Sequence, residues 1–146
     1  MCDSCLIKIY KTSAYSPECL SPEFWRKKAY CCNTTAVIRY KKLGKNIGIQ
    51  QLDDKISGEA LVKLFDEQKQ KCRYCDVDLS NGVFQLDHIA PLSRDGTHDL
   101  KNIQFVCAFC NRAKYNMSDL EFKKTLRAYV NRVSQVIERE DKELLG

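Results

Sequence analysis

Residues 72–110 have the sequence CRYCDVDLSNGVFQLDHIAPLSRDGTHDLKNIQFVCAFC, and this stretch decides the fold. It begins with one Cys-x-x-Cys pair, Cys72 and Cys75, and ends with another, Cys107 and Cys110. A structural zinc ion takes four tetrahedral ligands, and a two-residue spacer lets both thiolates of a pair face the same ion. The two pairs therefore predict a four-cysteine structural zinc site. In a small domain such an ion contributes folding free energy directly.

Between the cysteine pairs, the sequence predicts a ββα unit. Residues 83–89 are expected to form a strand that Pro91 ends, and residues 103–106 are expected to form the returning strand. A helix is expected to begin near Cys107 or Ala108. The predicted fold class is therefore α+β, with flanking helices around a small ββα core.

The same stretch carries residue types that phosphodiester hydrolysis requires. That reaction needs an activated water, neutralisation of the phosphate charge and help for the leaving 3′ oxygen. A neutral histidine can take the water proton near pH 7. An Asp carboxylate and an Asn carbonyl supply the oxygen ligands that a hard cation prefers, and such a cation stabilises the leaving alkoxide. The sequence offers Asp87, His88, Asn102 and Asn111 for these tasks.

This pattern resembles the HNH, or ββα-metal, endonuclease family. Asp87-His88 is similar to the first block of the family motif, Asn102 to the central block and Asn111 to the last. The four cysteines and the Cys-Asn-x-x-Lys ending resemble phage-type HNH and recombination endonucleases. The resemblance covers residues 57–118, which are expected to form the nuclease core.

The resemblance implies a role for each motif residue. His88 would be the general base, and Asp87 and Asn111 would bind one catalytic Mg²⁺ or Mn²⁺ ion. Asn102 would orient the base by holding its loop, and Lys114 would lie near the scissile phosphate. The implied products are a 5′-phosphate and a 3′-hydroxyl.

Two helices are expected before the nuclease core. Ser21 and Pro22 are typical of a helix start, and Gly44 is a natural stop. β-Branched residues near Thr34 weaken the second half of this helix, so a kink is possible there. A second helix is expected from about Gly58 to Gln70, after a linker with little structural signal.

The segment 21–56 is strongly basic, although the net charge of the whole chain is only +5. No acidic residue occurs between Phe24 and Leu52. Such a basic stripe is expected for a contact with the phosphate backbone of DNA. The alternative is an ordinary solvated helix face. The DNA-contact residues predicted from this stripe are Arg26, Lys27, Lys28, Arg39, Lys41, Lys42 and Lys45.

The remaining cysteines leave two interpretations open. Residues 1–20 are expected to be irregular and contain a third Cys-x-x-Cys pair. Together with one cysteine of the first helix, this pair could bind a second zinc ion; otherwise the thiols are free. The candidate ligands of the second site are Cys2, Cys5, Cys19 and Cys31.

The C-terminal segment, residues 119–146, is expected to be an amphipathic helix that begins with a capping box from Ser118 to Glu121. Its apolar stripe is expected to pack against the zinc core or the 58–70 helix, and a dimer contact is the alternative. The stripe comprises Phe122, Leu126, Tyr129, Val130, Val133 and Ile137.

The sequence as a whole predicts an intracellular, metal-dependent endonuclease that acts on double-stranded DNA as a monomer or homodimer. No membrane span or secretory signal is expected. Two alternatives are a zinc-stapled nucleic-acid-binding module without catalysis and an enzyme that cuts branched DNA. His98, the other histidine, is expected to make a hydrogen bond within its loop rather than to contact phosphate or the metal's surroundings.

Overall fold

The computed structural model describes residues 20–52 and 56–145. Three of the candidate ligands of a second zinc, Cys2, Cys5 and Cys19, lie outside this range. The elements are, in chain order, α2 (Pro22–Lys42), the 3₁₀ turn η2 (Ile49–Gln51), α3 (Gly58–Glu67), β1 (Gln85–His88), the 3₁₀ turns η3 (Leu92–Arg94) and η4 (Leu100–Asn102), β2 (Ile103–Val106), α4 (Ala108–Lys114) and α5 (Asp119–Leu145).

The predicted ββα unit is present. Strands β1 and β2 pair in an antiparallel register that sets Asp87 opposite Gln104 and His88 opposite Ile103. Helix α4 follows β2 directly, with Cys107 as its N-cap. The first strand is shorter than the predicted 83–89. The α+β fold class with flanking helices is confirmed.

Helix α2 begins and ends where the sequence predicts. The Ser21 side chain accepts a hydrogen bond from the Phe24 backbone N–H, and Pro22 occupies the first helical turn. Gly44, with φ of 78°, follows the last turn in the left-handed conformation that favours glycine. The helix is continuous through Thr34, so the possible kink is absent. The cost of a β-branched residue in a helix is only a few tenths of a kcal/mol, and the burial of nearby Ala36 and Val37 outweighs it.

An aromatic cluster joins α2 and α3 to the hairpin. The Trp25 ring stacks on Phe84 with centroids 5.6 Å apart. Phe105 of β2 meets Phe65 of α3 at 4.9 Å and lies edge-on to Trp25 at 6.0 Å. All four side chains are buried. Burying each of them contributes on the order of 2 kcal/mol, so these rings hold α2 against the nuclease core.

Two described residues of the stretch between α2 and α3, which is expected as a linker with little structural signal, also pack against the protein. Leu52 and Ile56 are buried. The Asn33 side chain donates to the Ile56 carbonyl at 2.9 Å and accepts from the Ile56 N–H at 3.2 Å. This two-point contact fixes both Ile56 and the orientation of the Asn33 amide.

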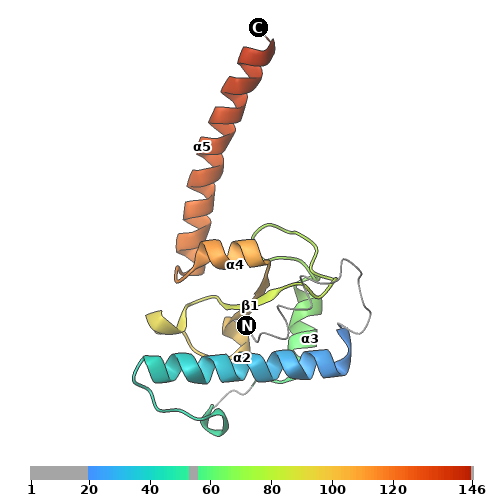
Figure 1. The fold of residues 1–146 in the computed structure, drawn as a ribbon, viewed down its shortest axis with the longest axis vertical. Helices are drawn as coiled ribbons and strands as arrows, with labels where there is room; N and C mark the ends of the chain where they lie inside the picture. Colours follow the sequence, from blue (N-terminus) through green and yellow to red (C-terminus); the bar gives the residue numbers. More distant parts are fainter. Residues whose placement is uncertain (1–19, 53–55, 146) are drawn as a thin grey trace.

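Helix α5 begins with the predicted capping box but then leaves the core. The Ser118 backbone N–H and hydroxyl both donate to the Glu121 carboxylate, at 2.8 and 2.9 Å. Phe122 is buried and Leu126 packs against the core, yet Tyr129 is 57% exposed. The predicted packing of the whole apolar stripe is therefore wrong beyond the first two turns, because the helix extends away from the domain (Figure 1). No helix in the described part of the chain is long and apolar enough to cross a membrane.

Gly96 provides a test of the loop that follows β1. A Cβ atom at this position would overlap the carbonyl group of Ala90 and approach the Pro91 carbonyl oxygen to 2.7 Å. Because backbone atoms form the obstacle, we expect Gly96→Ala to lower the free energy of unfolding by about 2 kcal/mol or more. Gly48→Ala is the matched control, since only the flexible Gln51 side chain lies near that position. Chemical denaturation of both variants checks the prediction, and equal stabilities would contradict it.

Candidate functional site

The structure brings the four predicted zinc ligands together. The sulfur atoms of Cys72, Cys75, Cys107 and Cys110 all lie within 4.8 Å of one another. The Cys75 and Cys107 sulfurs are 3.8 Å apart, which is about the separation that tetrahedral geometry with Zn–S bonds of roughly 2.3 Å requires. These four cysteines could therefore hold a zinc ion, as the spacing predicts.

Backbone groups around the cluster favour thiolates. The Cys107 N–H points at the Cys72 sulfur at 3.3 Å, and the Cys110 N–H points at the Cys107 sulfur at 3.4 Å. N–H donors stabilise negative charge on sulfur, and zinc binds the thiolate form. Within residues 20–52 and 56–145, no second cluster of three or more His, Cys, Asp or Glu ligands occurs.

Three of the candidate site residues, Asp87, His88 and Asn111, line a separate cleft with a volume of about 630 Å³, whereas Asn102 and Lys114 do not. Strand β1 contributes Asp87 and His88, and α4 contributes Asn111. The last turn of α2 contributes Arg39 and Lys42 to the same wall. The fold thus gathers an acid, a histidine and an amide beside two exposed cations.

Asp87 is already neutralised by a buried lysine. The Lys114 ammonium lies 3.0 Å from Asp87 Oδ2 and donates to the His88 carbonyl oxygen at 2.8 Å. Gln104 also donates to Asp87 Oδ2, at 2.8 Å. Lys114 is completely buried. A buried ammonium group needs an anionic partner, and α4 turns this side chain inward onto β1. Its expected position near a scissile phosphate stays a prediction.

Asn102 holds the loop after β1. Its side chain accepts from the Ala90 N–H at 2.8 Å and donates to the carbonyl oxygens of Ala90 and Thr97 at 2.9 and 2.7 Å. The backbone carbonyl of Asn102 accepts a hydrogen bond from the Ile89 N–H at 2.9 Å. These contacts are those that an orienting role would use, and the role itself stays a prediction.

His88 is buried and has a histidine partner. Its Nε2 atom lies 3.1 Å from Nδ1 of His98, and its own Nδ1 atom is buried without a hydrogen-bond partner among the described residues. Burial lowers the pKa of His88 to about 3, and the positive charges of His98, Arg39 and Lys114 act in the same direction. The His88 imidazole is therefore neutral at neutral pH.

His98 does more than the loop contact that the sequence predicts. Its Nε2 atom lies 2.9 Å from Asn33 Oδ1, and its backbone N–H donates to the Tyr40 hydroxyl at 3.1 Å. Burial is the main cause that lowers the pKa of His98. Sequence reasoning missed Asn33 and Tyr40, because they lie 65 and 58 residues from His98 and no motif connects them.

The predicted basic stripe is divided along α2. Arg26 and Lys27, near the start of the helix, form exposed ion pairs with Glu23. Arg26 and Arg39 are 13 residues apart, which is about 20 Å along a helix. Of the predicted DNA contacts, Arg39 and Lys42 line the cleft, whereas Arg26, Lys27, Lys28, Lys41 and Lys45 do not.

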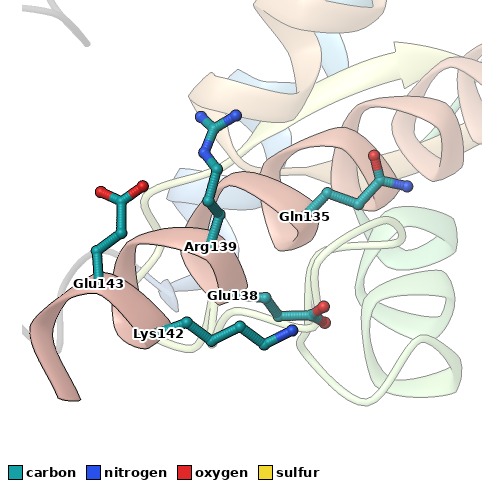
Figure 2. Close-up of a pocket in the computed structure, with 5 residues that line it drawn as sticks. All are labelled: Gln135, Glu138, Arg139, Lys142 and Glu143. Carbon is teal, nitrogen blue, oxygen red and sulfur yellow. The ribbon is translucent and has the colours of Figure 1, made fainter. Parts of the chain in front are cut away.

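A second depression, of about 360 Å³, lies on α5 (Figure 2). All the side chains that line it belong to this one helix, so no second element encloses a ligand there. They are Gln135, Glu138, Arg139, Lys142 and Glu143.

The cysteine cluster yields a direct prediction. Cys75→Ser removes one of the four sulfurs, so we expect the variant to lose zinc and much of its thermal stability, because metal binding and folding are coupled. Cys32→Ser is the control: Cys32 lies on α2, where burial raises the pKa of its thiol to about 11. Metal analysis of the wild-type protein should give one zinc per chain if the N-terminal cysteines do not form a second site. Full zinc content in Cys75→Ser would contradict the assignment.

Comparison with known proteins agrees with this geometry. Residues 72–127 match the family model described as HNH endonuclease. No curated protein and no solved structure matches the chain significantly. The matched segment contains the four cysteines, both strands, α4 and the start of α5. Residues 72–127 are therefore the part of this protein that is similar to the HNH endonuclease family, a family of nucleases.

Proposed function

We propose that this protein is a metal-dependent endonuclease that hydrolyses double-stranded DNA to a 5′-phosphate and a 3′-hydroxyl. His88 is the general base, and one Mg²⁺ or Mn²⁺ ion binds at Asp87 and Asn111. The observation that carries the proposal is the meeting of these three residues in one basic cleft within an HNH domain.

The donor set of the cleft suits a hard cation. Asp87 offers carboxylate oxygens and Asn111 a side-chain carbonyl, and magnesium prefers oxygen ligands. When bound, the cation supplies positive charge that stabilises the phosphate and the leaving alkoxide. Lys114 and Gln104 hold the Asp87 carboxylate from the protein side, so its orientation is fixed before any cation arrives.

The base and the positively charged wall complete the proposed site. A neutral imidazole can accept the proton of an attacking water. His88 is buried, and the hydrogen bonds of a general base often tighten only when the substrate binds. Arg39, Lys42 and Arg112 line the same cleft, and their positive charges suit the phosphates on either side of the cut.

Replacement of the base tests the catalytic part of the proposal. We expect His88→Ala to reduce plasmid cleavage in Mg²⁺ by at least about 10²-fold, because general-base catalysis contributes that much, while zinc content and DNA affinity stay unchanged. Ser93→Ala alters the same cleft without removing a proposed catalytic group and should cleave at close to the wild-type rate.

The outcome also separates the alternative functions. A wild-type protein that binds DNA but cuts none in Mg²⁺ or Mn²⁺ would indicate a non-catalytic binding module. Preferential cutting of four-way junctions over linear duplexes would indicate a junction-resolving enzyme. Undiminished cutting by His88→Ala would remove His88 from the mechanism.

Two charge-matched double variants test which part of the basic stripe on α2 contacts DNA. Arg39→Gln combined with Lys42→Gln removes two cations of the cleft, whereas Arg26→Gln combined with Lys27→Gln removes two cations near the start of α2. We expect the first pair to weaken DNA binding and to reduce the slope of log affinity against log salt by about 2, since each lost phosphate contact lowers the slope by about 1. The second pair should change both quantities much less. Equal losses in both pairs would indicate that the whole stripe contacts DNA.

A further inference from the structure

A chain of three buried side chains connects α2 to the proposed base. His88 Nε2 lies 3.1 Å from His98 Nδ1, and His98 Nε2 lies 2.9 Å from Asn33 Oδ1. The exposed fractions of Asn33, His98 and His88 are 3%, 5% and 5%. Asn33 lies outside the segment that matches the HNH family. These hydrogen bonds therefore join that segment to α2, the helix that precedes it.

The direction of every proton in this chain follows from Asn33. Its Nδ2 donates to the Ile56 carbonyl and its Oδ1 accepts from the Ile56 N–H, so the backbone fixes which amide atom is oxygen. Oδ1 is the atom that faces His98 and can only accept. His98 must therefore donate from Nε2.

The same argument applies to the hydrogen bond between His98 Nδ1 and His88 Nε2. A neutral His98 that carries its proton on Nε2 has a bare Nδ1, which accepts a hydrogen bond. His88 must then donate from Nε2, and its lone pair remains on Nδ1. This Nδ1 is itself buried and has no hydrogen-bond partner among the described residues, and His88 is one of the residues that line the cleft. Burial of both rings favours the neutral forms that this arrangement needs.

Helix α2 holds the chain from a single face. Asn33 and Tyr40 are seven residues apart, or about two helical turns, and both point toward His98. The Tyr40 hydroxyl accepts the His98 backbone N–H, which places the residue, while Asn33 orients its ring. An aromatic cluster around Trp25 fixes α2 to the core, so these anchors are rigid.

We propose that Asn33 and His98 are positioning residues that hold His88 in the tautomer with its proton-accepting lone pair on Nδ1. The proposal rests on the proposed role of His88 as general base. It assigns to α2 a part in completing the active site, in addition to the contact with DNA.

Nuclear magnetic resonance tests the arrangement in the intact, zinc-loaded protein. The chain has only two histidines, so ¹⁵N labelling of histidine gives four ring nitrogens to assign. We expect both rings to carry their proton on Nε2, with a scalar coupling across the hydrogen bond between His88 Nε2 and His98 Nδ1. A His88 ring protonated on Nδ1, or the absence of that coupling, would overturn the proposal.

A matched pair of variants tests the catalytic consequence. In His98→Gln the amide can still accept from His88 and donate to Asn33, whereas His98→Leu has similar size and can do neither. We expect His98→Leu to lower kcat by about 10²-fold with KM nearly unchanged, and His98→Gln to recover most of the loss. Equal kcat values in the two variants would show that the hydrogen bonds do not matter.

The two measurements separate failure of this inference from failure of the proposed function. If the wild-type protein cuts no DNA, the nuclease mechanism is wrong, and the coupling between the two rings still decides the geometry. If the wild-type protein cuts DNA and the two variants behave alike, the endonuclease assignment stands and the positioning role is wrong.

Discussion

The convergence of four cysteine sulfurs within 4.8 Å of one another is the constraint on which the rest of the domain depends. It ties the turn that follows α3 to the N-terminus of α4, and the hairpin lies between these two points in the chain. The two strands have only four residues each, which is too little for an independently stable sheet. A zinc ion held by the four cysteines would cross-link these two points and would supply the stability that this small sheet lacks. Strand β1 would then present Asp87 and His88 at fixed positions.

A buried polar network adjoins the cluster and prepares the cleft. Lys114 neutralises Asp87, Gln104 bridges Asp87 and the Tyr74 hydroxyl, and Asn102 closes the loop behind the strand. Burying such groups is costly unless they find partners, and apart from Gln104 Oε1 the groups named here have them, so the network has little freedom to adopt another arrangement. The same enclosure keeps Lys114 away from solvent and pairs it with Asp87. For the proposed function, the consequence is that the Asp87 carboxylate and the His88 imidazole are held in place before any substrate binds.

Helix α2 precedes the segment that matches the HNH family and contacts it in two ways. Its aromatic residues pack on the core, and one polar face carries Asn33 and Tyr40 to the loop that holds His98. Its last turn then places Arg39 and Lys42 at the cleft. Helix α5 behaves differently, since it packs through Phe122 and Leu126 and then extends into solvent with its apolar residues exposed (Figure 1).

Features with short-range causes could be predicted from the sequence by itself. These include the helix cap at Ser21, the capping box of α5 and the two-residue spacing within each cysteine pair, because each depends on residues a few positions apart. The hairpin and the meeting of the two cysteine pairs span more of the chain, and the known motif made them predictable. The family resemblance likewise rests on a local motif around Asp87-His88. Only the tertiary structure decided that Lys114 is buried, that the basic stripe divides, and that His98 joins His88 to Asn33. Those contacts span 10 to 65 residues and depend on how α2 and α4 pack against the hairpin, and no local periodicity encodes that packing.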